Sequence, residues 1–144
     1  MKKSTVHVMM SVAALLVIGW AAHVMAQETA KSTLDNLQAA YNGESNAKAK
    51  YETFAIKADE EGYKQVASLF RAAAHAEGIH AASHGKVIAG MGATPKADIA
   101  KPDVKSTKEN IEAALKGESY ERDTMYPGFI KQAEADKNAK AVRT

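Results

Sequence analysis

The spacing of apolar residues along the chain predicts long amphipathic helices. The first begins at a capping box, Ser32-Thr33-Leu34-Asp35, and runs to about Glu61, where Gly62 ends it. The second covers residues 63–91 and has glycines at its end. Alanine, glutamate and lysine are frequent after residue 26, and clusters of β-branched residues are few, so we expect an all-α fold.

The stretch from Gly92 to Lys105 contains Pro95 and Pro102 and cannot be a single helix. A third helix opens after it with a second capping box, Ser106-Thr107-Lys108-Glu109. We therefore expect a long crossover, which lets the third helix start at the same end of a helical bundle as the second.

The first and third helices are related by an internal repeat. Residues 33–45 align with residues 107–119, so that Gly43-Glu44-Ser45 recurs as Gly117-Glu118-Ser119, and the alignment resumes after one inserted residue. The insertion lies near Pro127, which lacks the N–H that a straight helix would use. An extra residue in a helix predicts a π-bulge, and π-bulges are frequent at functional sites.

Helical spacing turns one glutamate of each repeat inward. On the first helix, Glu44 shares a face with Leu37, Tyr41, Tyr51, Ala55 and Ala58. On the third helix, Glu118 shares a face with Ile111, Leu115, Met125 and Phe129, and Glu121 follows it by one turn. The alternative is that both glutamates flank a helix and contact water, but a repeated Gly-Glu-Ser motif favours burial.

One face of the second helix carries ionisable side chains between apolar ones. Counting along this helix from Val66 in alternating steps of four and three residues gives its predicted buried face: Val66, Phe70, Ala73, Glu77, His80, His84, Val87 and Met91. A carboxylate and an imidazole three residues apart on a helix form half of a typical two-metal site in a bundle. In the alternative, the buried face is rotated by one position, and Glu77 and His80 lie at the surface.

The chemistry of these inward glutamates favours a bound cation, because a buried carboxylate without a partner is costly. The sequence has no cysteine, which excludes disulfides, thiolate nucleophiles and iron–sulfur or thiolate zinc sites. The remaining ligands are glutamate, aspartate and histidine, which suit hard cations.

The first 26 residues have the pattern of an export signal. Lys2 and Lys3 precede an apolar run over residues 8–22, and Val24-Met25-Ala26 is a small-x-small cleavage site. We expect cleavage before Gln27 and a periplasmic protein with a single domain over residues 27–144. The alternative is an uncleaved anchor in the inner membrane, for which the apolar run is short.

Charge argues against a nucleic-acid partner. The formal net charge of the whole chain is +2, and removal of Lys2 and Lys3 with the signal leaves a neutral protein. We find no basic patch of the kind that binds nucleic acid.

Taken together, these motifs resemble those of the rubrerythrin family of ferritin-like di-iron proteins, over about residues 33–144. Four motifs carry the resemblance: Gly43-Glu44-Ser45, Glu77-Gly78-Ile79-His80, Gly117-Glu118-Ser119-Tyr120-Glu121 and Met125-Tyr126-Pro127-Gly128-Phe129. The resemblance implies a ferritin-like antiparallel four-helix bundle with its long crossover between helices two and three. On this comparison we expect the fourth helix to be largely missing from the chain and the domain to be incomplete at its C-terminus.

The resemblance also implies a ligand set and a reaction. Two iron ions are expected as cofactors, one bound by Glu44, Glu77, His80 and Glu121, and the other by Glu118, although manganese or zinc would accept the same ligands. The family reaction is reduction of hydrogen peroxide to water, which protects against oxidative stress. The family's four-cysteine rubredoxin domain is absent from this sequence, so the electrons would come from an external donor protein. Tyr51 and Tyr126 are expected to fill the core beside the site with their hydroxyls hydrogen-bonded.

Several alternatives stay open. The protein could be a ferroxidase or iron-storage protein, or a metal-binding helical module without turnover. The repeat partner of Glu77 and His80 would fall beyond Thr144, so we expect either a longer polypeptide or chains that share helices, as in a homodimer. Whether His84 contacts the site is undecided at this level.

Overall fold

The computed structural model describes residues 32–144, and these are helical apart from turns and one long crossover. The long elements are helices α2 (Thr33–Glu60), α3 (Lys64–Gly90), α4 (Thr107–Tyr120) and α5 (Tyr126–Ala135). A π-helical turn, η1 (Glu121–Met125), joins α4 to α5, and a short 3₁₀ helix, η2 (Ala141–Arg143), follows α5. The predicted all-α fold and its long crossover are confirmed, and both capping boxes are present, at Ser32 and at Ser106.

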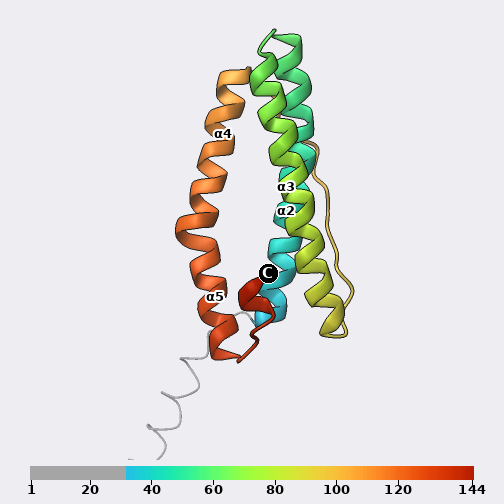
Figure 1. Cartoon of the computed structure of the whole chain (residues 1–144), viewed down its shortest axis with the longest axis vertical. Coiled ribbons are helices and arrows are strands. Elements are labelled where there is room, and N and C mark those ends of the chain that lie inside the picture. Colours follow the sequence, from blue (N-terminus) through green and yellow to red (C-terminus); the bar gives the residue numbers. More distant parts are fainter. Residues whose placement is uncertain (1–31) are drawn as a thin grey trace, which may run out of the picture. The chain divides into compact units, whose positions relative to one another are not determined.

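Helices α2 and α3 form an antiparallel hairpin that contains the core of the described chain (Figure 1). The turn between them uses Gly62, whose φ of 84° lies in the left-handed region that favours glycine. The core joins small side chains to three aromatic rings: Ala47, Tyr51, Phe54, Ala55, Ala58, Ala67, Phe70 and Ala74. Phe54 meets Phe70 edge to face, with ring centroids 5.4 Å apart. Alanines on both helices allow the backbones to approach, and the rings fill the space that remains.

The buried face of α3 differs from the predicted one. The predicted face and the observed face share only Phe70, Glu77 and His84. Between these, the buried positions are Ala67, Ala74, Ala81 and Ile88, and the predicted Val66, Ala73, His80, Val87 and Met91 are partly or fully exposed. The predicted and the observed buried positions both follow steps of three and four residues. The observed set places Ala67, Ala74 and Ala81 against α2, because a small side chain permits the closest contact between two helices. The expectation that His80 is buried is therefore wrong.

A single π-helical turn interrupts the third long helix. It covers Glu121–Met125, directly before Tyr126 and Pro127. The inserted residue of the repeat therefore takes the form predicted for it. Figure 1 shows α4 and α5 continuing as one rod through this turn. The extra residue changes which side chains face the hairpin beyond it, and Glu121 is the first residue of the turn.

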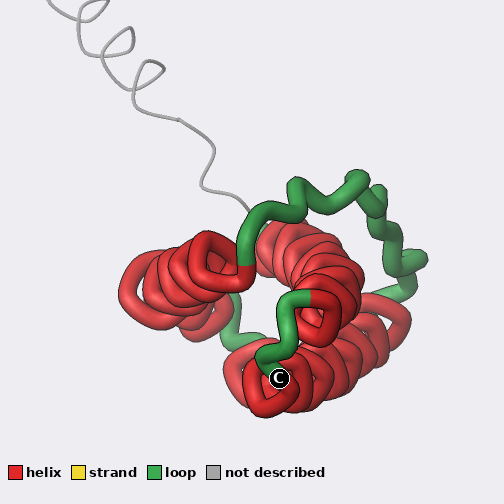
Figure 2. Tube along the Cα trace, turned by 90° about the horizontal axis from the view of Figure 1, so that it is seen from above, coloured by secondary structure: helices red, strands yellow, loops and turns green. Residues whose placement is uncertain are grey.

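The rod formed by α4 and α5 packs on the hairpin only sparsely. Its contacts are mainly with α2, with Tyr126 also reaching His84 of α3, and Figure 2 shows the rod standing apart from the α2–α3 pair. Ile111 is 40% exposed and Leu115 is 64% exposed, so the predicted burial of these two residues is wrong. Met125 and Phe129 are half-buried. The described residues include no helix that covers the exposed side of α4.

The crossover is held along α2 by three amide side chains. The Lys96 N–H donates to Gln38 Oε1 at 3.2 Å, the Asp98 N–H donates to Asn42 Oδ1 at 2.8 Å, and the Ala100 N–H donates to Asn46 Oδ1 at 2.9 Å. Four residues of an α-helix rise about 6 Å, and two extended residues span about 6.5 Å. Side chains four apart on α2 therefore match backbone groups two apart on the crossover. This match guides the chain back to the end at which α3 began (Figure 1).

The predicted export signal and the alternative membrane anchor both lie outside the described residues. Within residues 32–144, no helix combines the length and the apolar character needed to cross a membrane.

Candidate metal centre

Three of the predicted ligands come together between α2 and α3. One ligand atom from each of Glu44, Glu77 and His80 can be chosen so that all three atoms lie within 4.8 Å of one another. Glu44 and Glu77 are buried, with 1% and 5% of their surface exposed. The His80 side chain is 56% exposed, and its Nδ1 lies 2.9 Å from Glu77 Oε2 and 3.9 Å from Glu44 Oε1. His80 thus reaches the two carboxylates from the rim of the site.

The two buried carboxylates cannot both be ionised without cost. Burial and the neighbouring Glu44 carboxylate raise the pKa of Glu77. Burial opposes ionisation of Glu44 as well, but the nearby His84 imidazole and the hydrogen bond from the Tyr126 hydroxyl hold the pKa of Glu44 below its usual value. The metal-free site therefore keeps a proton on Glu77 beside an ionised Glu44, and a cation could replace that proton.

One oxygen of this pair has no hydrogen-bond partner. Glu44 Oε2 is buried and accepts no hydrogen bond, whereas Glu44 Oε1 accepts one from the Tyr126 hydroxyl. A buried carboxylate oxygen without a donor is costly, and a metal ion is a suitable partner for it. The donor set of two carboxylates and an imidazole therefore fits a hard divalent cation.

The two glutamates of the third helix face the same region. Tyr51 donates from its hydroxyl to Glu118 Oε1 at 2.5 Å. Burial, followed by the charges of Glu44 and Glu118, raises the pKa of Glu121 to about 7. These two glutamates do not join the tight group of Glu44, Glu77 and His80, and Glu118 is exposed, contrary to its predicted burial. The sparse packing of the rod explains both observations.

The two tyrosines are hydrogen-bonded to carboxylates, as expected. Tyr51 is paired with Glu118 and Tyr126 with Glu44, so each tyrosine comes from one repeat and each glutamate from the other. Burial and the adjacent carboxylates raise the pKa of both hydroxyls, which therefore remain protonated donors. Each hydroxyl fixes the orientation of one glutamate.

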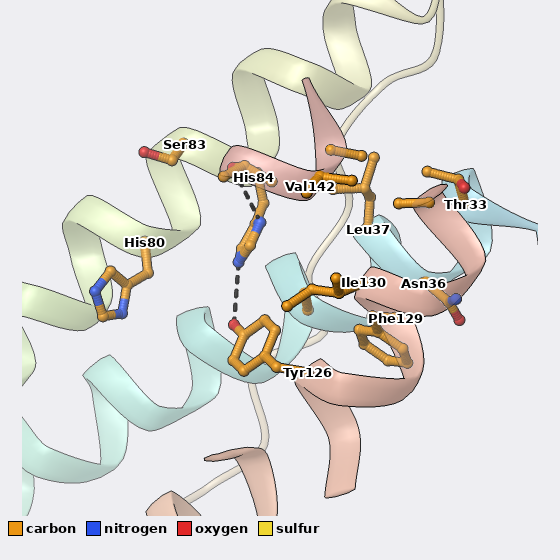
Figure 3. Close-up of a pocket in the computed structure, with 14 residues that line it drawn as sticks. Thr33, Asn36, Leu37, His80, Ser83, His84, Tyr126, Phe129, Ile130 and Val142 are labelled. Atoms are coloured by element: carbon orange, nitrogen blue, oxygen red, sulfur yellow. Dashed lines mark hydrogen bonds between the residues drawn. The ribbon is translucent and has the colours of Figure 1, made fainter. Parts of the chain in front are cut away.

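His84 is the residue whose place the sequence left open. It is buried, with 3% of its surface exposed, and its Nε2 lies 3.1 Å from the Tyr126 hydroxyl (Figure 3). The Nε2 atom is also 3.9 Å from Glu44 Oε1. Its position seven residues after Glu77, on the same face of α3, is the sequence signal that pointed to it.

A cavity of about 270 Å³ lies beside these residues, between α2, α3, α5 and η2. His80, His84, Tyr126 and Phe129 are among the side chains that line it (Figure 3). Most of the wall is apolar, with His80, His84 and Tyr126 toward one end and Thr33 and Asn36 at the other. The cavity therefore joins the carboxylate site to a small, mainly apolar space.

Comparison with known proteins identifies the family. Residues 35–144 match the family model described as Rubrerythrin. Nigerythrin of Nitratidesulfovibrio vulgaris is 45% identical over 112 residues, which cover 77% of this chain and 55% of that protein. The rubrerythrin of Porphyromonas gingivalis is 36% identical over 104 residues, which cover 72% of this chain and 52% of that protein.

The fold comparison agrees with the sequence comparison. A structure of nigerythrin in its fully reduced, all-ferrous state matches with a TM-score of 0.75 and 42% identity, covering 81% of this chain and 58% of that one. The chain thus spans little more than half the length of these relatives, and the match falls on its helical, ferritin-like part. The chain belongs to the rubrerythrin family.

Proposed function

We propose that this chain is the iron-binding part of a non-haem di-iron peroxidase that reduces hydrogen peroxide to water. Membership of the rubrerythrin family implies a di-iron site. The main support for the proposal is that Glu44, Glu77 and His80 come together in a mostly buried site. Two further glutamates face this site from the third helix: Glu121, on the π-helical turn, and Glu118, just before it.

The ligand assignment follows from this placement. Glu44, Glu77, His80 and Glu121 would hold one iron ion, and Glu118 would contribute to the other. Carboxylates are hard ligands that can bind a metal in more than one manner, so they accept both Fe(II) and Fe(III). When bound, two ferrous ions supply two electrons together, which is the number needed to cleave the O–O bond of a peroxide.

The protein side chains prepare the site in three ways. The protonated hydroxyls of Tyr51 and Tyr126 each occupy one oxygen of a glutamate and so leave the other oxygen for the metal. Glu77 and Glu121 carry raised pKa values in the metal-free protein, and they release protons when a cation binds. The cavity that reaches His80 can admit a molecule as small as hydrogen peroxide.

The test compares two oxidants. Protein loaded with Fe(II) under anaerobic conditions is mixed with stoichiometric hydrogen peroxide or with dioxygen, and oxidation is followed by stopped-flow absorbance. A peroxidase is oxidised faster by peroxide, and Glu77→Gln abolishes the difference, whereas Glu134→Gln on the exposed side of α5 retains it. Equal or slower oxidation by peroxide contradicts the proposal. Oxidation of many Fe(II) ions per chain, in a multi-subunit shell, would instead identify a ferroxidase or iron-storage protein.

The partners and the location belong to the same proposal. The electrons would come from an external donor protein, and a homodimer is the assembly we expect. Export to the periplasm is proposed from residues 1–26 alone, and an N-terminus at Gln27 in protein from an exporting host would support it. An N-terminus at Met1 would instead indicate an inner-membrane anchor.

A further inference from the structure

His84 occupies a buried position with a hydrogen-bond partner on each side of its ring. On one side, Nε2 lies 3.1 Å from the Tyr126 hydroxyl, and on the other side Nδ1 lies 3.3 Å from Thr144 Oγ1. The rings of His84 and Tyr126 are nearly parallel, with centroids 6.0 Å apart and an interplanar angle of 24°. Figure 3 shows the imidazole pointing from α3 toward the Tyr126 hydroxyl.

Glu44 sets the direction of the hydrogen bond between Tyr126 and His84. The Tyr126 hydroxyl donates to Glu44 Oε1, so its oxygen is free to accept from the N–H on Nε2 of His84. The other ring nitrogen, Nδ1, is paired with the Thr144 hydroxyl, which can donate or accept. Each ring nitrogen of His84 therefore has one hydroxyl as its hydrogen-bond partner.

We propose that His84 is a positioning residue for the metal centre: it fixes the Tyr126 hydroxyl on Glu44 Oε1 and so keeps Glu44 Oε2 directed at the metal. This inference rests on the proposed function of the site. His84 acts through Tyr126, because its Nε2 already contacts that hydroxyl and lies 3.9 Å from the nearest oxygen of Glu44. The hydrogen-bond partners of metal ligands commonly determine ligand orientation in this way.

A simple packing role explains the arrangement less well. A buried imidazole is costly unless both of its nitrogens are satisfied, and leucine would fill a similar volume without that cost. The cavity beside His84 is mainly apolar, and the polar partners of the ring are the Tyr126 and Thr144 hydroxyls. The ring nevertheless meets the one hydroxyl that orients a buried carboxylate.

The experiment measures the affinity for Co(II) of wild type, His84→Leu and His84→Gln by absorbance titration. Glutamine can extend an amide N–H to the Tyr126 hydroxyl, and leucine cannot. We expect His84→Leu to weaken Co(II) binding about 10- to 100-fold, and His84→Gln to restore most of the affinity. His75→Leu, a substitution at an exposed position of α3, is the control and should bind as wild type does.

A second pair of variants separates positioning from packing. If His84 acts through Tyr126, then His84→Leu should weaken binding much less in a Tyr126→Phe background than in wild type. Circular dichroism and thermal unfolding of the metal-free proteins check that each variant is folded. If His84→Leu does not fold, His84→Asn takes its place, since asparagine is too short to reach the hydroxyl, and it should bind more weakly than His84→Gln.

The outcomes are distinct. Wild-type affinity in folded His84→Leu, full additivity with Tyr126→Phe, or equal affinity of the asparagine and glutamine variants would each overturn the inference while leaving the proposed function intact. A wild-type protein that binds no Co(II) and no Fe(II) would overturn the proposed function itself, and the role of His84 with it.

Discussion

The Asp136 carboxylate, at the end of α5, caps the beginning of α2 at Thr33. Its Oδ2 accepts from the Thr33 hydroxyl at 2.7 Å and from the Thr33 N–H at 3.2 Å. The same contact recurs in the other repeat, where Glu61 Oε2 accepts from the Thr107 N–H at 2.9 Å. Each long helix of the repeat thus ends in an acidic residue that caps the first turn of the other, where the helix dipole favours negative charge.

The cap at Thr33 predicts a pH-dependent contribution to stability. Hydrogen bonds from Thr33 and Gln132 hold the pKa of Asp136 below its usual value. Because the unfolded chain binds this proton more tightly, the contribution is present at neutral pH and is lost as pH falls through the lowered folded-state pKa. We expect Asp136→Asn to lower the Tm at pH 7, and the deficit to shrink at pH 3. Glu134→Gln, at an exposed neighbouring position, is the control, and a deficit independent of pH would contradict this role.

The core of the hairpin predicts the cost of a small deletion. Ile88 on α3 has 0% of its surface exposed, whereas Ile79 on the same helix is 55% exposed. We expect Ile88→Val to reduce the free energy of unfolding by about 0.5–1.5 kcal/mol, because a buried methylene is lost and the space is only partly refilled. Ile79→Val provides the matched control and should change stability little. Equal effects in urea unfolding would show that this part of α3 is not packed as described.

The carboxylate cluster predicts that the stability of the metal-free protein falls as pH rises, which is opposite to the effect of Asp136. Burial, followed by the charge of Glu44, raises the folded-state pKa of Glu77, and burial followed by the Glu44 and Glu118 charges raises that of Glu121 to about 7. The folded protein therefore binds these protons more tightly than the unfolded chain, so stability falls as pH rises from about 4.3, the ordinary glutamate value. The part due to Glu121 should level off above about pH 7.

Urea midpoints at pH 5, 6, 7 and 8 in the presence of a chelator would measure this decline. Glu121→Gln should flatten the decline below pH 7, and Glu77→Gln should flatten it over the whole range. The exposed variant Glu112→Gln should follow wild type. A wild-type stability that rises from pH 5 to pH 8 would show that the site does not hold these protons.

The amide contacts along α2 predict local protection of the crossover. Asn46 accepts from the Ala100 N–H through Oδ1 and donates to Asp98 O through Nδ2. Asn46→Ala should therefore speed hydrogen exchange at the Ala100 amide. Asn46→Asp keeps the acceptor but not the donor, so it should leave exchange at Ala100 slow. Fast exchange at Ala100 in the wild type would show that the crossover is not held on α2.

Much of the fold could be predicted because it depends on local signals. Capping boxes, glycines and prolines predicted both ends of α2 and α3 and the start of α4 to within a residue or two. The repeat gave the position of the π-helical turn, since an inserted residue in a continuous helix has few other solutions. The nearness of Glu44 to Glu77 was implied by the resemblance to the rubrerythrin family, and the inward faces predicted for the two residues agreed with it.

What the sequence could not provide was the exact rotation of α3 and the packing of the third helix. Steps of three and four fit two adjacent faces equally well, and the choice of Ala74 over Ala73 depends on the partner helix. Likewise, the spacing of Ile111 and Leu115 indicates an apolar face but not what covers it. The role of His84 depends on the Tyr126 hydroxyl, which comes from a helix 42 residues further along the chain.

The most direct test of the account is the metal content of the wild type and of a Glu77→Ala/His80→Ala double variant. Both proteins are loaded anaerobically with Fe(II), freed of excess metal and analysed by elemental mass spectrometry, with circular dichroism to check folding. The account predicts at least about one tightly bound iron per wild-type chain, from the ligand set of a carboxylate-rich site, and loss of that iron in the double variant. Unchanged metal content in the folded double variant would contradict the metal centre and every function derived from it.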